Sequence, residues 1–298
     1  MSTEQQQASP VPASIHPGTH IGLVTLRVSN LEHSRHFYED ILAFQPIEHT
    51  SAKVVLGGQD KQPLLALVEL PGAAPQPRRA TGLHHVAILL PTRADLGRQL
   101  LRLARVHWQH YQEDHLVSEA LYISDPDGNG LEMYSDRPKE CWRWTNGIVE
   151  MATDPVDSEG LAEAGRRDAE PWEVLPAGTR IGHMHLRAAD IKEAERFYHT
   201  ILGFDVTCHF RGAIFLNADH YHHHIGLNTW HSLGAQPAPE HCVGLQSYAI
   251  VLPTREALQA VKERLAAHDV AFEVRGDLIQ VHDPWYNQII MKVEPFVV

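Results

Sequence analysis

The sequence predicts an α+β fold built from four copies of one βαβββ unit. The segment IGLVTLRVSNLEHSRHFYEDILAF, which begins at Ile21, matches IGHMHLRAADIKEAERFYHTILGF, which begins at Ile181, at a constant offset of 160 residues. A second pair, GLHHVAILLPTRADL from Gly82 and GLQSYAIVLPTREAL from Gly244, is followed in both copies by a turn of the type DPDGN or DPWYN. Internal repetition of this kind indicates an architecture assembled from similar units.

Each unit is expected to open with a strand and a helix. Apolar and polar residues alternate at the start of the first pair, as in a half-buried strand, and a helical period follows. Asn30 and Asp190 stand where they can cap these helices. The aromatic pairs at 37–38 and 197–198 fall on the face predicted to be buried. Each unit then continues with two or three strands, the last of them opened by the aspartate-proline turn.

The borders of these modules follow from the repeats. We expect modules at 19–70, 82–137, 180–231 and 243–294, which in chain order make a first domain at 19–137 and a second at 180–294. Residues 1–17, rich in Gln, Ser, Ala and Pro, are predicted to be a flexible leader. Residues 138–179 are predicted to be a linker with a short helix at 158–168.

The composition narrows the class of protein. Of 298 residues, 43% are hydrophobic and 21% charged, and no apolar run approaches the roughly 20 residues needed to cross a bilayer. The first residues lack the basic start and apolar stretch of a signal peptide, so a cytoplasmic location is expected. A net charge of -12 argues against a nucleic-acid partner. Three distant cysteines without a CxxC pair predict neither a disulfide framework nor a thiolate zinc site.

Residues that can bind a metal stand at corresponding points of the two middle modules. His85 and Glu132 belong to the second module and His183 to the third. Glu132 lies between Leu131 and Met133 in a short apolar strand, where a carboxylate is costly to bury unless it is paired or coordinated. Two imidazoles and one carboxylate form a facial triad, the ligand set suited to a non-haem ferrous ion with open positions.

Strand alternation separates these candidates from their neighbours. His84 is expected to face away from His85, because successive side chains of a strand point to opposite faces. His183 and His185 share a face, so alternation leaves both open. Alignment with His85 favours His183 as the ligand.

Two long motifs carry a family resemblance. The strand-helix unit ending in FYxxxLGF, together with the DPDGN turn and its following glutamate, resembles the vicinal oxygen chelate superfamily over residues 19–294. Within it, DHLVSEALYISDPDGNGLEMY and DHYHHHIGLNTW look like the catechol 2,3-dioxygenase branch, whose members cleave aromatic rings. The resemblance implies modules paired into cupped, barrel-like sheets that enclose a metal.

The resemblance also implies which modules pair. Carried over by position, the ligand of the first strand falls at Leu23, His85, His183 and Ser247, and that of the last strand at Leu64, Glu132, His224 and Ile290. The outer modules have lost every coordinating side chain, and only the two inner modules together hold a complete set. We therefore expect the inner modules to pair around the metal and the outer modules to pair as a scaffold.

Three further residues are expected to take part in catalysis by resemblance. His224, in HHHIGLN, matches the acid-base histidine, with His223 as its rival because alternation decides which ring faces inward. Tyr122 is expected to hydrogen-bond a substrate oxygen, and His115 to line the oxygen side of the pocket. Leu116 stands where the motif commonly carries glycine.

The resulting expectation is an Fe(II)-dependent extradiol dioxygenase that cleaves a catechol-type ring and incorporates both atoms of O2. Mn(II) and Zn(II) are alternative metals, since imidazole and carboxylate also suit them. A hydroquinone is an alternative substrate, and a homo-oligomer is possible in this superfamily. The competing functions are a metal-dependent lyase or isomerase of the glyoxalase kind and a non-enzymatic binding protein on the same fold.

Overall fold

The structure is a computed structural model that describes residues 14–167 and 173–293. The first module contains β1 (His20–Val28), α1 (Leu31–Arg35) continued by a π-helical turn (His36–Ile41), β2 (Gln45–His49), β3 (Lys53–Gly57) and β4 (Pro63–Glu69). The second contains β5 (Gly82–Leu89), α2 (Arg93–Arg105), β6 (His110–Asp114), β7 (Ser118–Ser124) and β8 (Gly130–Asp136). Both follow the predicted βαβββ order.

The later modules repeat this order. The third contains β11 (Arg180–Arg187), α4 (Ile191–Glu195) with a π-helical turn (Arg196–Ile201), β12 (Asp205–Phe210), β13 (Ala213–Asn217) and β14 (Ile225–Asn228). The fourth contains β15 (Gly244–Leu252), α5 (Arg255–Ala267), β16 (Phe272–Arg275), β17 (Leu278–His282) and β18 (Gln288–Val293). The fold class predicted from the repeats is therefore confirmed.

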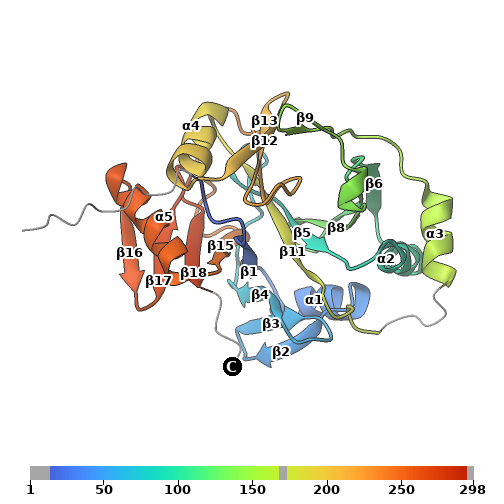
Figure 1. The fold of residues 1–298 in the computed structure, drawn as a ribbon. Helices are drawn as coiled ribbons and strands as arrows, with labels where there is room; N and C mark the ends of the chain where they lie inside the picture. Colours follow the sequence, from blue (N-terminus) through green and yellow to red (C-terminus); the bar gives the residue numbers. More distant parts are fainter. Residues whose placement is uncertain (1–13, 168–172, 294–298) are drawn as a thin grey trace, which may run out of the picture.

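The modules pair inner with inner and outer with outer. One eight-stranded sheet has the order β12-β13-β14-β11-β5-β8-β7-β6, and the other has the order β16-β17-β18-β15-β1-β4-β3-β2. Within each sheet one antiparallel pair of strands joins the two modules. The pair is β11 with β5 in the inner sheet and β1 with β15 in the outer sheet. β5 and β11 lie side by side near the centre of the molecule (Figure 1). This is the pairing that the distribution of metal ligands led us to expect, and each sheet takes one module from each half of the chain.

Tyrosines of the repeated FY pairs connect the two sheets. Tyr38, in the outer sheet's first module, donates to Oδ2 of Asp125 in the second module at 3.0 Å, and Tyr198 donates to Oδ2 of Asp283 at the same distance. Both tyrosines are fully buried, so each bond lies inside the core that the sheets share. The predicted caps also form, since the side chain of Asn30 accepts from the N–H of His33 at 2.8 Å.

The segments outside the modules are partly ordered. Residues 1–13 of the expected leader lie outside the described residues, but Ile15 is buried and its N–H donates to the carbonyl of Gly203 at 2.7 Å. In the linker, the short hairpin β9 (Trp144–Thr145) and β10 (Ile148–Val149) precedes α3 (Ser158–Arg167), close to the expected helix. α3 packs along α2 (Figure 1), where Gly97 and Gly165 permit close contact. Within the described residues no helix is long and apolar enough to cross a membrane.

Candidate metal centre and its cavity

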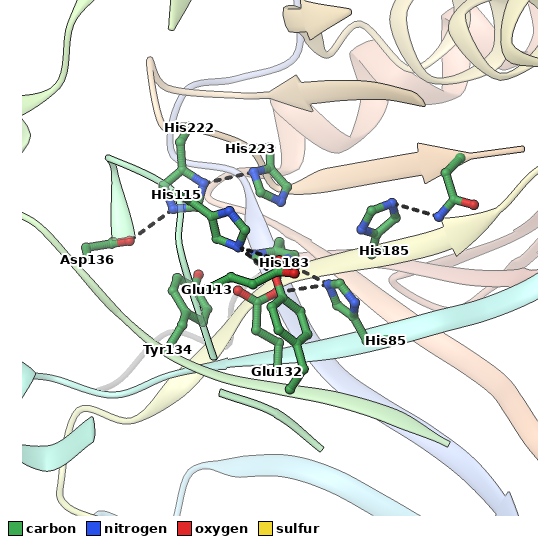
Figure 2. Close-up of polar contacts among 12 residues, drawn as sticks. His85, Glu113, His115, Glu132, Tyr134, Asp136, His183, His185, His222 and His223 are labelled. Atoms are coloured by element: carbon green, nitrogen blue, oxygen red, sulfur yellow. Dashed lines mark hydrogen bonds and ion pairs between the residues drawn. The ribbon is translucent and has the colours of Figure 1, made fainter. Parts of the chain in front are cut away.

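The three predicted metal ligands converge. Nε2 of His85 lies 2.9 Å and Nε2 of His183 lies 3.0 Å from the same oxygen, Oε2 of Glu132, and the two nitrogens are 3.4 Å apart. All three side chains are buried. Figure 2 shows them pointing toward one another from three adjacent strands. The structure thus brings together the residues that the sequence singled out.

Strand register explains the convergence. Ala87 on β5 pairs with Glu132 on the parallel strand β8 and with His183 on the antiparallel strand β11. His85 lies two residues before Ala87 on the same strand and therefore faces the same side of the sheet. The methyl group of Ala87 is small enough to leave space between the flanking side chains. Three strands of the inner sheet therefore deliver three ligand atoms to one point.

The charge state of the site suits a cation. Burial alone would raise the pKa of Glu132, but the charge and hydrogen bonds of His183 and His85 lower this pKa well below its usual range. Burial lowers the pKa of His183 to about 4, and this outweighs the attraction of Glu132. At neutral pH the site therefore contains an ionised carboxylate beside a neutral imidazole. A neutral imidazole has a lone pair on one of its nitrogens, and this is the form that binds a metal.

The triad opens into a large cavity. Its volume is about 1530 Å³, and His85, Glu132 and His183 form part of its wall. Aromatic side chains, among them Phe215 and Trp230, line it as well. The sequence offered no ground to prefer Trp230 over the other tryptophans, of which Trp142 is buried in packing and Trp172 lies outside the described residues.

Tyr122 and His115 lie in this cavity, as expected. Tyr122 is the direct cross-strand partner of Glu132, because the turn between β7 and β8 pairs Ser124 with Gly130 and fixes the register. Its hydroxyl lies 2.7 Å from Nε2 of His115. Burial and the charge of Glu132 raise the pKa of Tyr122 well above 10, so its hydroxyl stays protonated. The two side chains form one hydrogen-bonded wall beside the triad.

His115 is held by the linker. Its Nδ1–H donates to the carbonyl of Ala152 at 2.8 Å, which fixes the proton on Nδ1 and, in the neutral ring, leaves Nε2 to accept from Tyr122. The next residue, Leu116, has a φ of 67°, the left-handed conformation for which glycine is the usual choice. The turn therefore keeps its shape without glycine. Residues 151–153 line the cavity, so the linker is also part of the site's wall.

Of the two candidates for the acid-base residue, the structure places His223, and not His224, in the wall of the cavity. His224 does not line the cavity; its ring faces the backbone, where Nδ1 accepts from the N–H of Ala218 at 3.2 Å. The ring of His223 lines the cavity and lies 4.0 Å from the ring of His183. Both positions precede β14, which begins at Ile225, so strand alternation does not govern them.

His84 also differs from the expectation. In the pairing of β5 with β11, His185 faces His85 and Leu186 faces Leu83, which leaves His84 as the extra residue of a β-bulge. The bulge turns His84 toward the cavity, where its ring lies 4.7 Å from that of His185. Burial lowers the pKa of His84 to about 3, helped by neighbouring His85 and Arg187. Nitrogens of His84, His85 and His185 form a second close group, which shares His85 with the triad.

The comparisons with known proteins agree with this geometry. The model of the Glyoxalase/Bleomycin resistance protein/Dioxygenase superfamily matches residues 20–133 and 180–278, so the chain belongs to this superfamily, as its motifs indicated. Catechol-2,3-dioxygenase of Bacillus subtilis (strain 168) is 44% identical over 275 residues, which cover 91% of this chain and 96% of the relative. Biphenyl-2,3-diol 1,2-dioxygenase 3 of Rhodococcus globerulus is 31% identical over 154 residues, 47% of this chain and 78% of the relative.

Solved structures support the fold. Glyoxalase I from Zea mays superposes with a TM-score of 0.54 at 13% identity, over 92% of each chain. The cppA protein of Streptococcus pneumoniae TIGR4 gives 0.58 at 11% identity, over 93% of this chain and 99% of its own. The curated relatives, and not the solved structures, place the chain in the class of extradiol ring-cleaving dioxygenases.

Proposed function

We propose that the protein is an Fe(II)-dependent extradiol dioxygenase that cleaves a catechol-type aromatic ring with both atoms of O2. The observation that carries the proposal is the meeting of two imidazole nitrogens and one carboxylate oxygen at 2.9 to 3.4 Å on the wall of the cavity. The 44% identity to a relative named catechol-2,3-dioxygenase supports the choice of substrate class.

The donor set fits a divalent ion. At bond lengths of about 2.1 Å, ligand atoms around an ion lie about 3.0 Å apart at right angles and about 3.4 Å apart in a tetrahedron. The three separations of the triad fall in this range. His85, His183 and Glu132 would hold the ion. When bound, it would supply a template on which both hydroxyls of the substrate and dioxygen meet.

Packing orients one of the ligands. The buried Nδ1 of His183 has no hydrogen-bond partner among the described residues. Its ring instead packs against the rings of His223 and Tyr134, with ring centroids 4.0 and 5.1 Å away. The neighbouring rings thus take the place of the outer-shell hydrogen bond that usually fixes a metal-bound histidine.

His223 is proposed as the base that takes a proton from the substrate. Burial lowers its pKa well below 6.5, and the nearby ring of His183 adds to this, so its imidazole is neutral at pH 7 and can accept. Beside His85, Tyr122 keeps its proton and donates it to Nε2 of His115, so its oxygen can accept a hydrogen bond from a substrate hydroxyl. His115 holds that hydroxyl in place. His223 therefore lies beside one histidine ligand, His183, and Tyr122 beside the other, His85, with ring centroids 4.0 and 5.4 Å apart.

A glyoxalase-type reaction fits less well, since that chemistry prefers a second carboxylate on the metal. In the described part of the chain, the groups of close ligand atoms that include Glu132 contain no second carboxylate. Glu113 lies beside His115, at 3.8 Å from Nε2 of that ring. The cavity that surrounds a complete triad also favours an enzyme over a binding protein.

The test is turnover under controlled metal loading. Protein purified anaerobically and loaded with Fe(II), Mn(II) or Zn(II) is mixed with catechol or hydroquinone, and the yellow ring-opened product is followed together with oxygen uptake. We expect Fe(II) protein to consume one O2 for each catechol cleaved, and Glu132→Ala and His183→Ala to abolish turnover while the circular dichroism spectrum is unchanged. Turnover at the wild-type level in both variants would refute the site.

A further inference from the structure

The cavity is much larger than a bare catechol ring requires. A dry cavity of roughly 150 Å³ is enough to hold benzene, whereas this one has a volume of about 1530 Å³. Its lining continues past the triad to Arg187, Trp230 and His231 on one side. Space beyond the triad is therefore available for a substituent of the ring, and the side chains at that end indicate its chemistry.

Arg187 stands at that end of the cavity. On β11 the residues His183, His185 and Arg187 alternate, so they share one face of the sheet. From His183 to Arg187 the strand covers about 13 Å, at 3.3 Å per residue. All three line the cavity. A ring held at the triad would therefore extend along β11 toward a guanidinium group.

The guanidinium of Arg187 has spare hydrogen-bonding capacity. It is half-buried, and within residues 14–167 and 173–293 it forms no ion pair with a carboxylate. Among the described residues its one hydrogen bond is a long one, at 3.5 Å, to the carbonyl of Arg78. A partly desolvated guanidinium with free N–H groups is well suited to a carboxylate, which it can bind through two parallel hydrogen bonds.

The repeat supplies an internal comparison. Arg27 occupies the position of Arg187 in the outer sheet, 160 residues earlier. It donates to two carbonyls, those of Glu240 at 2.9 Å and Leu245 at 3.3 Å, and does not line the cavity. Arg27 therefore holds a connecting segment through two hydrogen bonds. Arg187 has only one long hydrogen bond to a carbonyl, and it faces the cavity.

The surroundings of Arg187 add positive charge and hydrogen-bond donors. Arg78 and Arg79 are exposed at the rim of the same cavity, and neither forms an ion pair with a described carboxylate. Among the described acidic residues that line the cavity, Glu132 belongs to the triad, Glu113 lies beside His115 and Asp127 accepts from Ser29, and none of them forms an ion pair with Arg187. The end of the cavity at Arg187 thus favours an anion.

We infer that Arg187 forms an anion subsite that binds a carboxylate carried on the aromatic ring of the substrate. The inference rests on the proposed function, since it places the diol of that ring at the triad. The preferred substrates are then catechols with an acidic side chain. Arg187 contributes to substrate specificity, whereas the metal ligands act on the diol.

The test compares a charged substrate with its neutral counterpart. The kcat/KM values of 3,4-dihydroxyphenylacetate and its methyl ester are measured in the wild type, in Arg187→Met and, as the matched control, in Arg27→Met. We expect the acid to exceed the ester by at least about tenfold, or 1.4 kcal/mol, in the wild type and in Arg27→Met, and the ratio to fall to about one in Arg187→Met. A wild-type ratio near one, or a ratio that Arg187→Met leaves unchanged, would overturn the inference.

Two further measurements keep the result interpretable. Arg187→Lys retains the charge, so its acid-to-ester ratio should lie above that of Arg187→Met even if both are less stable. If catechol is cleaved but neither of these compounds is, the inference is overturned. If catechol is not cleaved either, the proposed function fails, and the subsite is judged by calorimetric titration of the metal-free protein with phenylacetate and methyl phenylacetate. Tighter binding of the acid that is lost in Arg187→Met supports the subsite, whereas equal affinities contradict it.

Discussion

The Nδ1 atoms of His222 and His223 lie 2.8 Å apart, so one of the two rings donates its proton to the other. Nε2 of His222 lies 3.0 Å from the carboxylate of Asp136, which can only accept, and the proton of a neutral His222 is therefore on Nε2. Nδ1 of His222 then accepts from His223, which leaves the lone pair of His223 on Nε2. Asp136 and His222 thus set the tautomer that a base at this position needs.

Replacing His223 should therefore impair catalysis far more than replacing its neighbour. General acid-base catalysis contributes about 10²- to 10⁴-fold, so we expect kcat with catechol to fall by at least about 100-fold in His223→Gln. His224→Gln is the matched control, because that ring faces the backbone of Ala218. Its kcat should stay within about threefold of the wild type. Steady-state oxygen uptake measures kcat in both variants. A larger fall in kcat in His224→Gln than in His223→Gln would support His224, the residue assigned from the sequence.

Removal of the carboxylate from the triad should abolish tight metal binding. We expect Glu132→Gln to weaken Fe(II) binding by more than the 10- to 100-fold that loss of an outer-shell partner costs. Glu119→Gln provides the comparison, because Glu119 is equally buried on β7 but pairs with Arg93 away from the triad. Anaerobic calorimetry and elemental analysis measure the bound iron. Equal iron content in both variants would show that Glu132 is not a ligand.

Much of the fold followed from the sequence because repetition constrains it. The offset of 160 residues located the equivalent strands and helices, and the loss of ligands at Leu23 and Ser247 predicted that the inner modules share a sheet. Glu132 was recognisable because a carboxylate in an apolar strand needs a partner. These features depend on local sequence and on strand alternation, which hold wherever the strands are regular.

The side chains whose positions differ from the expectation, His84 and His224, lie where the backbone is irregular. A β-bulge turned His84 toward the cavity, and the segment before β14 brought His223 to the cavity in place of His224. Neither the β-bulge nor the irregular segment before β14 can be recognised from the alternation of apolar and polar residues in the sequence. The contribution of Ala152 to the site also depends on a contact between the linker and a distant turn, which no local pattern predicts.

Acid should destabilise the metal-free protein. Burial lowers the pKa of His183 to about 4 and that of His224 to about 3, whereas in the unfolded chain a histidine titrates near about 6.5. Below pH of about 6.5 the unfolded chain binds protons that the folded protein does not. Stability should therefore fall as the pH decreases toward about 4, by up to about 1.4 kcal/mol per pH unit for each such histidine. Glu132, whose pKa is lowered, loses its own contribution in the same direction as it becomes protonated.

Chemical unfolding of the metal-free protein at several pH values between about 4.5 and 7.5 measures the slope of the unfolding free energy against pH. His224→Gln removes one of the buried histidines without touching the triad, so its slope should be smaller than that of the wild type. A stability that is constant over this range, or that rises as the pH falls, would contradict the proposed charge states.

The left-handed backbone of Leu116 predicts the effect of a glycine at this position. A non-glycine residue in this conformation costs about 1–2 kcal/mol, whereas glycine costs up to about 1 kcal/mol in conformational entropy. We therefore expect Leu116→Gly to change the free energy of unfolding by between 0 and about 1 kcal/mol in the stabilising direction, with turnover retained. Leu278, similarly exposed but in strand β17, is the control, and Leu278→Gly should cost about 1 kcal/mol. Equal destabilisation by both changes would argue against strain at Leu116.

Anomalous diffraction at the iron edge, from crystals of the protein loaded with Fe(II) without oxygen, locates the ion directly. We expect one peak within bonding distance of Nε2 of His85, Nε2 of His183 and the carboxylate of Glu132. A peak placed instead between His84, His85 and His185, the group that shares His85 with the triad, would contradict the assignment of the metal centre, as would iron bound at neither group.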